Sequence, residues 1–293
     1  MSLKNLIEIF KMNTPRKSSD LMHVWAVFWA NLKIFLSYRI WVITDTLSTI
    51  ASIAMYSFMG VQVNPRQLVD AGYGNVGWLA FALVGVATAN YLWMCMGRIS
   101  SAMQDEIEEG TFEQIVSSLI HMRSYIIGQS IRSFLISGYY MVGVLIIGVF
   151  VLKVPFILTF ETTISFMIVL LMMVASYMGI GIIIAGVTIV YKKGDELTLL
   201  FISITEFLGG VLFPLNYLKD FPPLLTIALF MPYTYALDAE RKILLNGETL
   251  MSSSVFNSVV LLGVYAAVLI PFGLLVFKWG YNRIRDEGTV ATY

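Results

Sequence analysis

Six apolar stretches divide the chain into segments long enough to cross a lipid bilayer. A crossing helix needs about 20 mostly apolar residues. We interpret each stretch as a helix, because an open strand edge would leave backbone groups without hydrogen bonds in lipid. The pattern therefore predicts an all-α membrane protein with six transmembrane helices, at residues 40–60, 77–97, 125–152, 162–190, 197–216 and 255–279.

Residues 20–38 precede the first predicted span and follow a different pattern. Apolar side chains, among them Trp25 and Phe28, recur there at three- and four-residue steps, whereas His23 and Lys33 fall on other faces. This spacing predicts an N-terminal amphipathic helix whose aromatic residues anchor it in the headgroup plane. The alternative is a soluble helix that packs on a partner.

The connection between the fifth and sixth spans contains a segment that is apolar but too short to cross. Residues 221–232 lie between prolines and number about a dozen, which favours a re-entrant or interfacial segment. Gly209, Gly210 and Pro214 interrupt the end of the fifth span. We therefore expect that helix to break and the chain to turn back, with an outer re-entrant segment at 217–250.

The composition excludes an ordinary soluble protein. Apolar residues make up 58% of the chain and charged residues 13%, with a mean hydropathy of +0.78. A soluble fold of 293 residues could not bury that much apolar surface. The net charge is zero, so no nucleic-acid partner is indicated. One cysteine, Cys95, and two distant histidines give no expectation of a disulfide framework or a metal site.

The basic residues orient the predicted spans. Thirteen lysines and arginines fall on the side that holds both termini, five fall on the opposite side, and Arg132 lies within a span. The positive-inside rule therefore predicts a multi-pass protein of the plasma membrane with both termini in the cytoplasm. The chain then divides into an N-terminal region (1–38), a transmembrane domain (39–280) and a cytoplasmic tail (281–293).

A charged segment on the predicted cytoplasmic side, residues 98–123, joins the second and third spans. Ile99, Met103 and Ile107 form one apolar stripe at helical spacing, and a second stripe follows Gly110. The pattern predicts two short amphipathic helices around an acidic elbow that docks on a partner. The alternative is a solvated acidic loop. The elbow comprises Asp105, Glu106, Glu108, Glu109, Gly110, Thr111, Phe112 and Glu113.

Three ionisable residues lie within the predicted spans, where charge is costly and therefore indicates function. Asp45 and Arg132 both lie roughly 8–11 Å from the cytoplasmic ends of their helices, so a salt bridge between them is possible. Glu206 lies near the middle of the fifth span and is an alternative partner for Arg132. The competing interpretation for Asp45 and Arg132 is that their side chains extend to the headgroups.

Three motifs carry a resemblance to a known family: Glu-Glu-Gly-Thr-Phe-Glu at 108–113, Gly-Gly-Val-Leu-Phe-Pro-Leu at 209–215, and Met-Pro-Tyr-Thr-Tyr-Ala-Leu-Asp at 231–238. In order and spacing they resemble the ABC-2 type family, the membrane subunits of one class of ATP-driven exporter. The first motif is similar to the family's cytoplasmic coupling segment. The second is similar to a glycine-rich stretch of its fifth span, and the third to its outer segment before the last span.

The resemblance implies a permease subunit without catalytic or metal-binding residues. A separate ATP-binding cassette subunit would bind ATP and magnesium, and in this chain no lysine directly follows a glycine, as a phosphate-binding loop requires. The family pairs two permeases, so we expect a homodimer or a pair with a similar paralogue. The outer gate is expected at Gly209, Gly210, Phe213, Pro214, Pro232 and Asp238.

The substrate is the least determined property. Aromatic and methionine-rich spans favour a hydrophobic or amphipathic compound such as a drug, a lipid or a lipid-linked molecule, moved outward by alternating access. One rival function is an ATP-independent channel or secondary transporter, which the acidic elbow disfavours. Another is an intramembrane enzyme, which would need a nucleophile and base or metal ligands at membrane depth.

Overall fold

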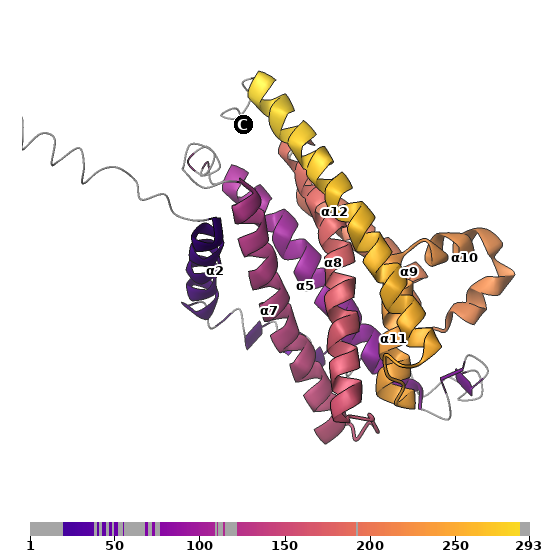
Figure 1. Cartoon of the computed structure of the whole chain (residues 1–293). Helices are drawn as coiled ribbons and strands as arrows, with labels where there is room; N and C mark the ends of the chain where they lie inside the picture. The colour runs from indigo at the N-terminus through magenta and orange to yellow at the C-terminus, as the bar shows by residue number, and fades with distance from the viewer. Residues whose placement is uncertain are drawn as a thin grey trace, which may run out of the picture.

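The molecule is described by a computed structural model, shown in Figure 1. The ranges described without interruption are 20–37, 77–108, 122–191 and 193–287. Gly110, Gln114 and a few positions between residues 40 and 73 are described individually. Within these residues every regular element is a helix and no strand occurs, which confirms the predicted all-α class.

Four long helices run alongside one another and form the body of the molecule (Figure 1). They are α5 (Trp78–Glu108), α7 (Met122–Phe150), α8 (Phe160–Tyr191) and α12 (Ser253–Glu287). Each contains a stretch long and apolar enough to cross a membrane, and these stretches match four of the six predicted spans. The first predicted span lies largely outside the described residues, so the count of six stays a prediction.

The predicted N-terminal helix is present as α2 (Asp20–Ser37), which packs beside α7 (Figure 1). Its aromatic side chains contact one another, with Trp25 and Phe28 ring centroids 5.4 Å apart. Phe28 is buried, whereas Trp25 and Trp29 are exposed. The structure therefore confirms a helix at these residues, whereas its amphipathic character and its place in the headgroup plane stay predictions.

Helices α8 and α12 approach each other unusually closely because glycines line their contact. A methyl group added at Gly179 or Gly186 of α8 would lie within 2.8 Å of the α12 backbone. Gly273 and Gly280 of α12 lie against the carbonyl oxygens of those same two glycines. Small residues allow such backbone contact between membrane helices.

The fifth predicted span is helical only over α9 (Gly194–Leu208), which has 15 residues. The helix ends at Gly209, and Gly210 follows with a φ of 75°, a left-handed conformation that favours glycine. The chain then forms η2 (Leu215–Asp220) and α10 (Pro222–Leu229). The break therefore lies where Gly209, Gly210 and Pro214 predicted it, although the membrane depth of these segments stays a prediction.

The chain after the break returns into the bundle as α11 (Pro232–Asn246), which packs against α5, α8 and α12. Its C-terminal end lies near the segment that precedes α5. There the Asn246 side-chain amide donates a hydrogen bond of 3.1 Å to the Gly72 carbonyl. Its N-terminal end lies beside the middle of α8, where the Tyr233 N–H donates to the Tyr177 hydroxyl at 3.2 Å. Helix α11 therefore runs through the interior, whereas α10 projects to one side (Figure 1).

Candidate functional site

A buried polar network joins α11 to α5 and to the break after α9. Glu240 and Arg241 of α11 are 0% and 2% exposed, although both carry ionisable groups. One carboxyl oxygen of Glu240 accepts a hydrogen bond from the Thr88 hydroxyl of α5. Its other oxygen has no partner among the described residues. Buried groups of this kind are costly and indicate a functional or organising role.

Arg241 fixes the position of the broken helix end. Its guanidinium group donates to the Gly210 carbonyl at 2.8 Å and to the Val211 carbonyl at 2.6 Å. Its Nε donates to the Phe81 carbonyl of α5 at 3.3 Å, and the guanidinium carbon lies 3.4 Å from the Phe81 ring centroid. The planar group thus satisfies backbone carbonyls that the helix break releases, and it stacks on an aromatic ring as arginine does.

Two glycines make room for this network. A methyl group at Gly85 of α5 would lie 2.3 Å from the Val211 carbonyl oxygen and 2.6 Å from Arg241 Nη2. A methyl group at Gly209 would lie 2.3 Å from the Tyr233 ring. Tyr233 is fully buried, and its hydroxyl donates to the Gly85 carbonyl at 3.3 Å. The contact between α5, α11 and the break therefore depends on glycine at both positions.

Asp238 connects α11 to the segment that precedes α5. Its carboxylate accepts a hydrogen bond of 2.9 Å from the Tyr73 hydroxyl. The same carboxylate forms an ion pair with Lys242, with a nitrogen–oxygen distance of 2.7 Å. Burial raises the pKa of the Tyr73 hydroxyl above its ordinary value, so the group stays protonated and acts as the donor. Of the predicted outer-gate residues, Gly209, Gly210 and Asp238 thus belong to one connected assembly.

Phe213, Pro214 and Pro232 lie around the same break. The Phe213 ring packs against Phe207 with centroids 6.3 Å apart. Pro214 precedes η2, and Pro232 occupies the first turn of α11, where a missing N–H costs nothing. Their role in gating stays a prediction.

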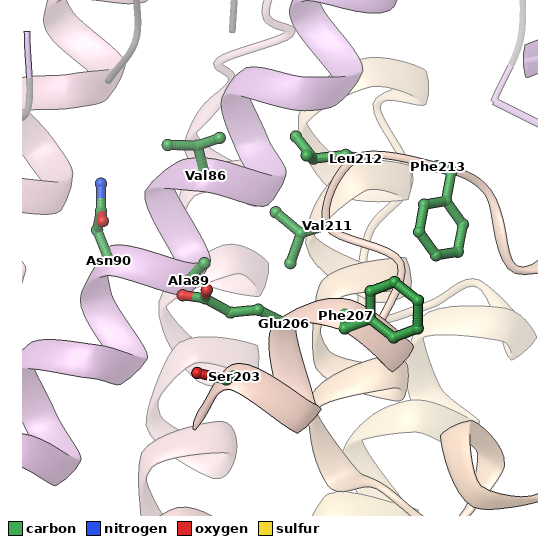
Figure 2. A pocket seen from close by; sticks show the side chains of 9 residues that line it. All are labelled: Val86, Ala89, Asn90, Ser203, Glu206, Phe207, Val211, Leu212 and Phe213. Atoms are coloured by element: carbon green, nitrogen blue, oxygen red, sulfur yellow. The ribbon is translucent and has the colours of Figure 1, made fainter. Parts of the chain in front are cut away.

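A cavity of about 280 Å³ lies between α5 and α9 (Figure 2), and Val211, which lines it, also accepts a hydrogen bond from Arg241. Glu206 extends from α9 toward α5, with its carboxylate beside Ala89 (Figure 2). No ion pair reaches this carboxylate among the described residues. The lining residues are Val86, Ala89 and Asn90 of α5, Ser203, Glu206 and Phe207 of α9, and Val211, Leu212 and Phe213 after the break.

The remaining intramembrane candidates are only partly described. Arg132 is half-buried in α7 and donates to the Gln129 side chain at 3.4 Å. It does not line the cavity that contains Glu206. Asp45 lies outside the described residues, so its pairing with Arg132 stays a prediction.

Gly110 is the one residue of the proposed acidic elbow for which the structure describes both backbone and exposure. Helix α5 continues without interruption from the second predicted span to Glu108, so the first short helix of the prediction is an extension of that span. Gly110 is exposed and has a φ of 71°, which agrees with an interruption there. The other proposed elbow side chains lie outside what the structure describes: Asp105, Glu106, Glu108, Glu109, Thr111, Phe112 and Glu113.

Sequence reasoning missed the buried charges of α11. It counted Arg241 only as a basic residue of the outer connection and did not single out Glu240, because charged residues outside the apolar stretches are ordinarily solvated. A signal was nevertheless present. Tyr233, Leu237, Glu240 and Leu244 recur at three- and four-residue steps, which places the glutamate on the apolar face of the helix.

The long apolar helices and the polar residues buried among them define a multi-pass membrane protein. A family model described as "ABC-2 type transporter" matches residues 22–245, and the chain belongs to this family of membrane transport domains. The match confirms the resemblance drawn from the three motifs and the interpretation as a transporter permease. A search of curated proteins finds no match to the chain.

Proposed function

We propose that the chain is the permease subunit of an ATP-driven exporter and works with a separate ATP-binding cassette subunit. A second permease chain, identical or similar, completes the transport path. The transported compound is hydrophobic or amphipathic and leaves toward the outer side of the plasma membrane. The observation that carries this proposal is the family match over residues 22–245, which includes the predicted coupling segment.

The arrangement of α9, α11 and α5 supports an outer gate at the helix break. Arg241 holds the carbonyls of Gly210 and Val211 against α5, so α9 and α5 can separate there only if these hydrogen bonds break or move with them. Irregular backbone at membrane depth is tolerated where protein or a cavity takes up the freed groups. We call Arg241 and the carbonyls of Phe81, Gly210 and Val211 the latch. These hydrogen bonds close the path between the α5–α9 cavity and the outer side.

In the proposed mechanism, ATP-driven closure of the partner subunits moves the cytoplasmic elbow, and α5 carries that movement into the bundle. Substrate enters between the helices from the inner side and leaves when the latch between α5 and α11 rearranges. ATP binding must favour one of these two states over the other, because a ligand shifts an equilibrium only through its differential affinity.

The test is transport by the full chain in proteoliposomes, with and without a candidate ATPase subunit of the ATP-binding cassette class. We expect substrate movement only when both proteins and ATP are present. Reversing the charge of the elbow with the double substitution Glu108→Lys and Glu109→Lys should abolish co-purification with the ATPase and ATP-dependent transport. Acidic residues at an interface control association in this way.

A matched control reverses the adjacent acidic pair at the start of α9, Asp195→Lys and Glu196→Lys. Both side chains are exposed, and the change in net charge is the same. This variant should keep the ATPase bound. The proposal is wrong if the chain alone transports substrate at the full rate, or if the elbow variant and the control retain the ATPase equally well.

A further inference from the structure

The α5–α9 cavity combines a polar end with apolar walls. Glu206, Asn90 and Ser203 supply oxygen atoms that accept hydrogen bonds, whereas the other lining residues are apolar. An alkylammonium group has three N–H donors and a positive charge, so a cavity whose one ionisable lining residue is a carboxylate suits it. Glu206 has no cation of its own among the described residues, and a charge of this kind at membrane depth indicates a functional site.

An apolar groove of about 760 Å³ adjoins the cavity and shares three of its lining residues, Phe207, Leu212 and Phe213. It is lined further by Trp78, Tyr217 and Phe221, which offer flat apolar surface. The cavity alone, at about 280 Å³, is at the lower limit for a drug-sized ligand, and the two together are ample. A ligand with a small polar end and a larger aromatic or aliphatic body fits this shape.

The charges around both hollows have one sign. Glu206 is the charged residue of the cavity and Asp220 that of the groove, and no lysine or arginine lines either one in the described part of the chain. The nearby Arg241 donates its hydrogen bonds to backbone carbonyls of Phe81, Gly210 and Val211 and belongs to the latch. An anionic headgroup would be repelled by both carboxylates, whereas a cation would be attracted to them.

We propose that Glu206 binds the protonated amine of an amphipathic substrate, whose apolar body occupies the adjoining groove between Trp78 and Phe213. This inference rests on the proposed transport function and names the substrate class: amphipathic amines rather than anionic or neutral lipids. Glu206 acts by direct contact, and Asn90 and Ser203 add polar atoms to the lining of the same cavity.

The test is equilibrium binding of dansylcadaverine, a fluorescent amphipathic primary amine, to the full chain in lipid nanodiscs without any ATPase. Its N-acetylated derivative keeps the aromatic body but lacks the charge, and empty nanodiscs give the lipid background. We expect the amine to bind more tightly than the derivative. Glu206→Gln should weaken amine binding by about ten- to a hundredfold, which corresponds to one charge-assisted hydrogen bond, and leave the derivative unaffected.

Glu196→Gln is the matched control, because Glu196 lies on the same helix but is exposed at its first turn. This variant should bind the amine as the wild type does. Retained binding of the derivative shows that Glu206→Gln is folded. If Glu206→Gln does not fold, Glu206→Asp replaces it, because aspartate keeps the charge on a shorter side chain. Glu206→Asp should weaken binding of the amine by about threefold and leave binding of the derivative unchanged. This effect is smaller than the loss of a full charge-assisted hydrogen bond.

Three results would overturn the inference: equal affinity of Glu206→Gln and wild type for the amine, an equal loss for the derivative, or no preference of the wild type for the amine. The binding assay contains no ATPase, so it fails or succeeds independently of the transport assay. Specific amine binding without ATP-driven movement in proteoliposomes would leave the site intact and refute the exporter. ATP-driven transport of other compounds without amine binding would support the exporter and refute the amine site.

Discussion

Replacing Gly85 with alanine tests whether the latch is as tightly packed as the structure indicates. The added methyl carbon would lie 2.3 Å from the Val211 carbonyl oxygen, well inside van der Waals contact, and 2.6 Å from Arg241 Nη2. Neither neighbour can yield easily, because one is backbone and the other donates two further hydrogen bonds. Overpacking of this kind costs about 1–3 kcal/mol. Losing the Arg241–Val211 hydrogen bond adds about 1.5–3 kcal/mol.

Together the two costs come to about 2.5–6 kcal/mol, which lowers the melting temperature by roughly 5–24 °C on the scale of domains of 150–250 residues. The assay is thermal unfolding of the purified chain in detergent, followed by intrinsic tryptophan fluorescence. Gly97→Ala is the control on the same helix, since no described atom lies within 4 Å of the methyl group it would add. The control should melt at or above the wild-type temperature. If Gly85→Ala has the same melting temperature as Gly97→Ala, then α5 and the break after α9 are not in contact as described.

Three other predictions concern separate parts of the molecule. Gly186→Ala should lower the melting temperature, because the added methyl group would lie 2.7 Å from the Phe277 backbone. Gly263→Ala on α12 is the control and should leave the melting temperature unchanged. Equal melting temperatures of the two variants would contradict the close α8–α12 contact. Tyr73→Phe removes a hydrogen bond to a carboxylate and should cost about 1.5–3 kcal/mol in chemical unfolding, and an unchanged midpoint would show that this bond contributes nothing. Asp45→Arg and Arg132→Asp should each reduce the folded yield, and combining them should restore it in size-exclusion chromatography if the two residues pair.

The sequence predicted the long helices well because bilayer thickness imposes a length and an apolar composition that no other element shares. The four stretches that the structure describes as long helices all coincide with predicted spans. The break after Leu208 was also predicted, since adjacent glycines and a following proline rarely continue a helix. Local chemistry was sufficient in these cases.

The direction of α11 could not be predicted in the same way. Its mean composition is neither apolar nor strongly polar, so length and hydropathy place it in a loop. Only tertiary contacts bury Glu240 and Arg241, and their partners Thr88 and Phe81 lie far away in the sequence. The cavity around Glu206 likewise depends on how α5 and α9 meet, which no periodicity specifies.

The unbroken course of α5 has a mechanical consequence. With 31 residues it is roughly 46 Å long, so a tilt of about 5° about its C-terminal end displaces its N-terminal end by roughly 4 Å. That displacement exceeds the 3.3 Å that separates Arg241 Nε from the Phe81 carbonyl near this end. A stiff rod of this length needs no relay of intermediate side chains. A few degrees of rotation applied at the Glu108 end are geometrically sufficient to break a contact near the Trp78 end.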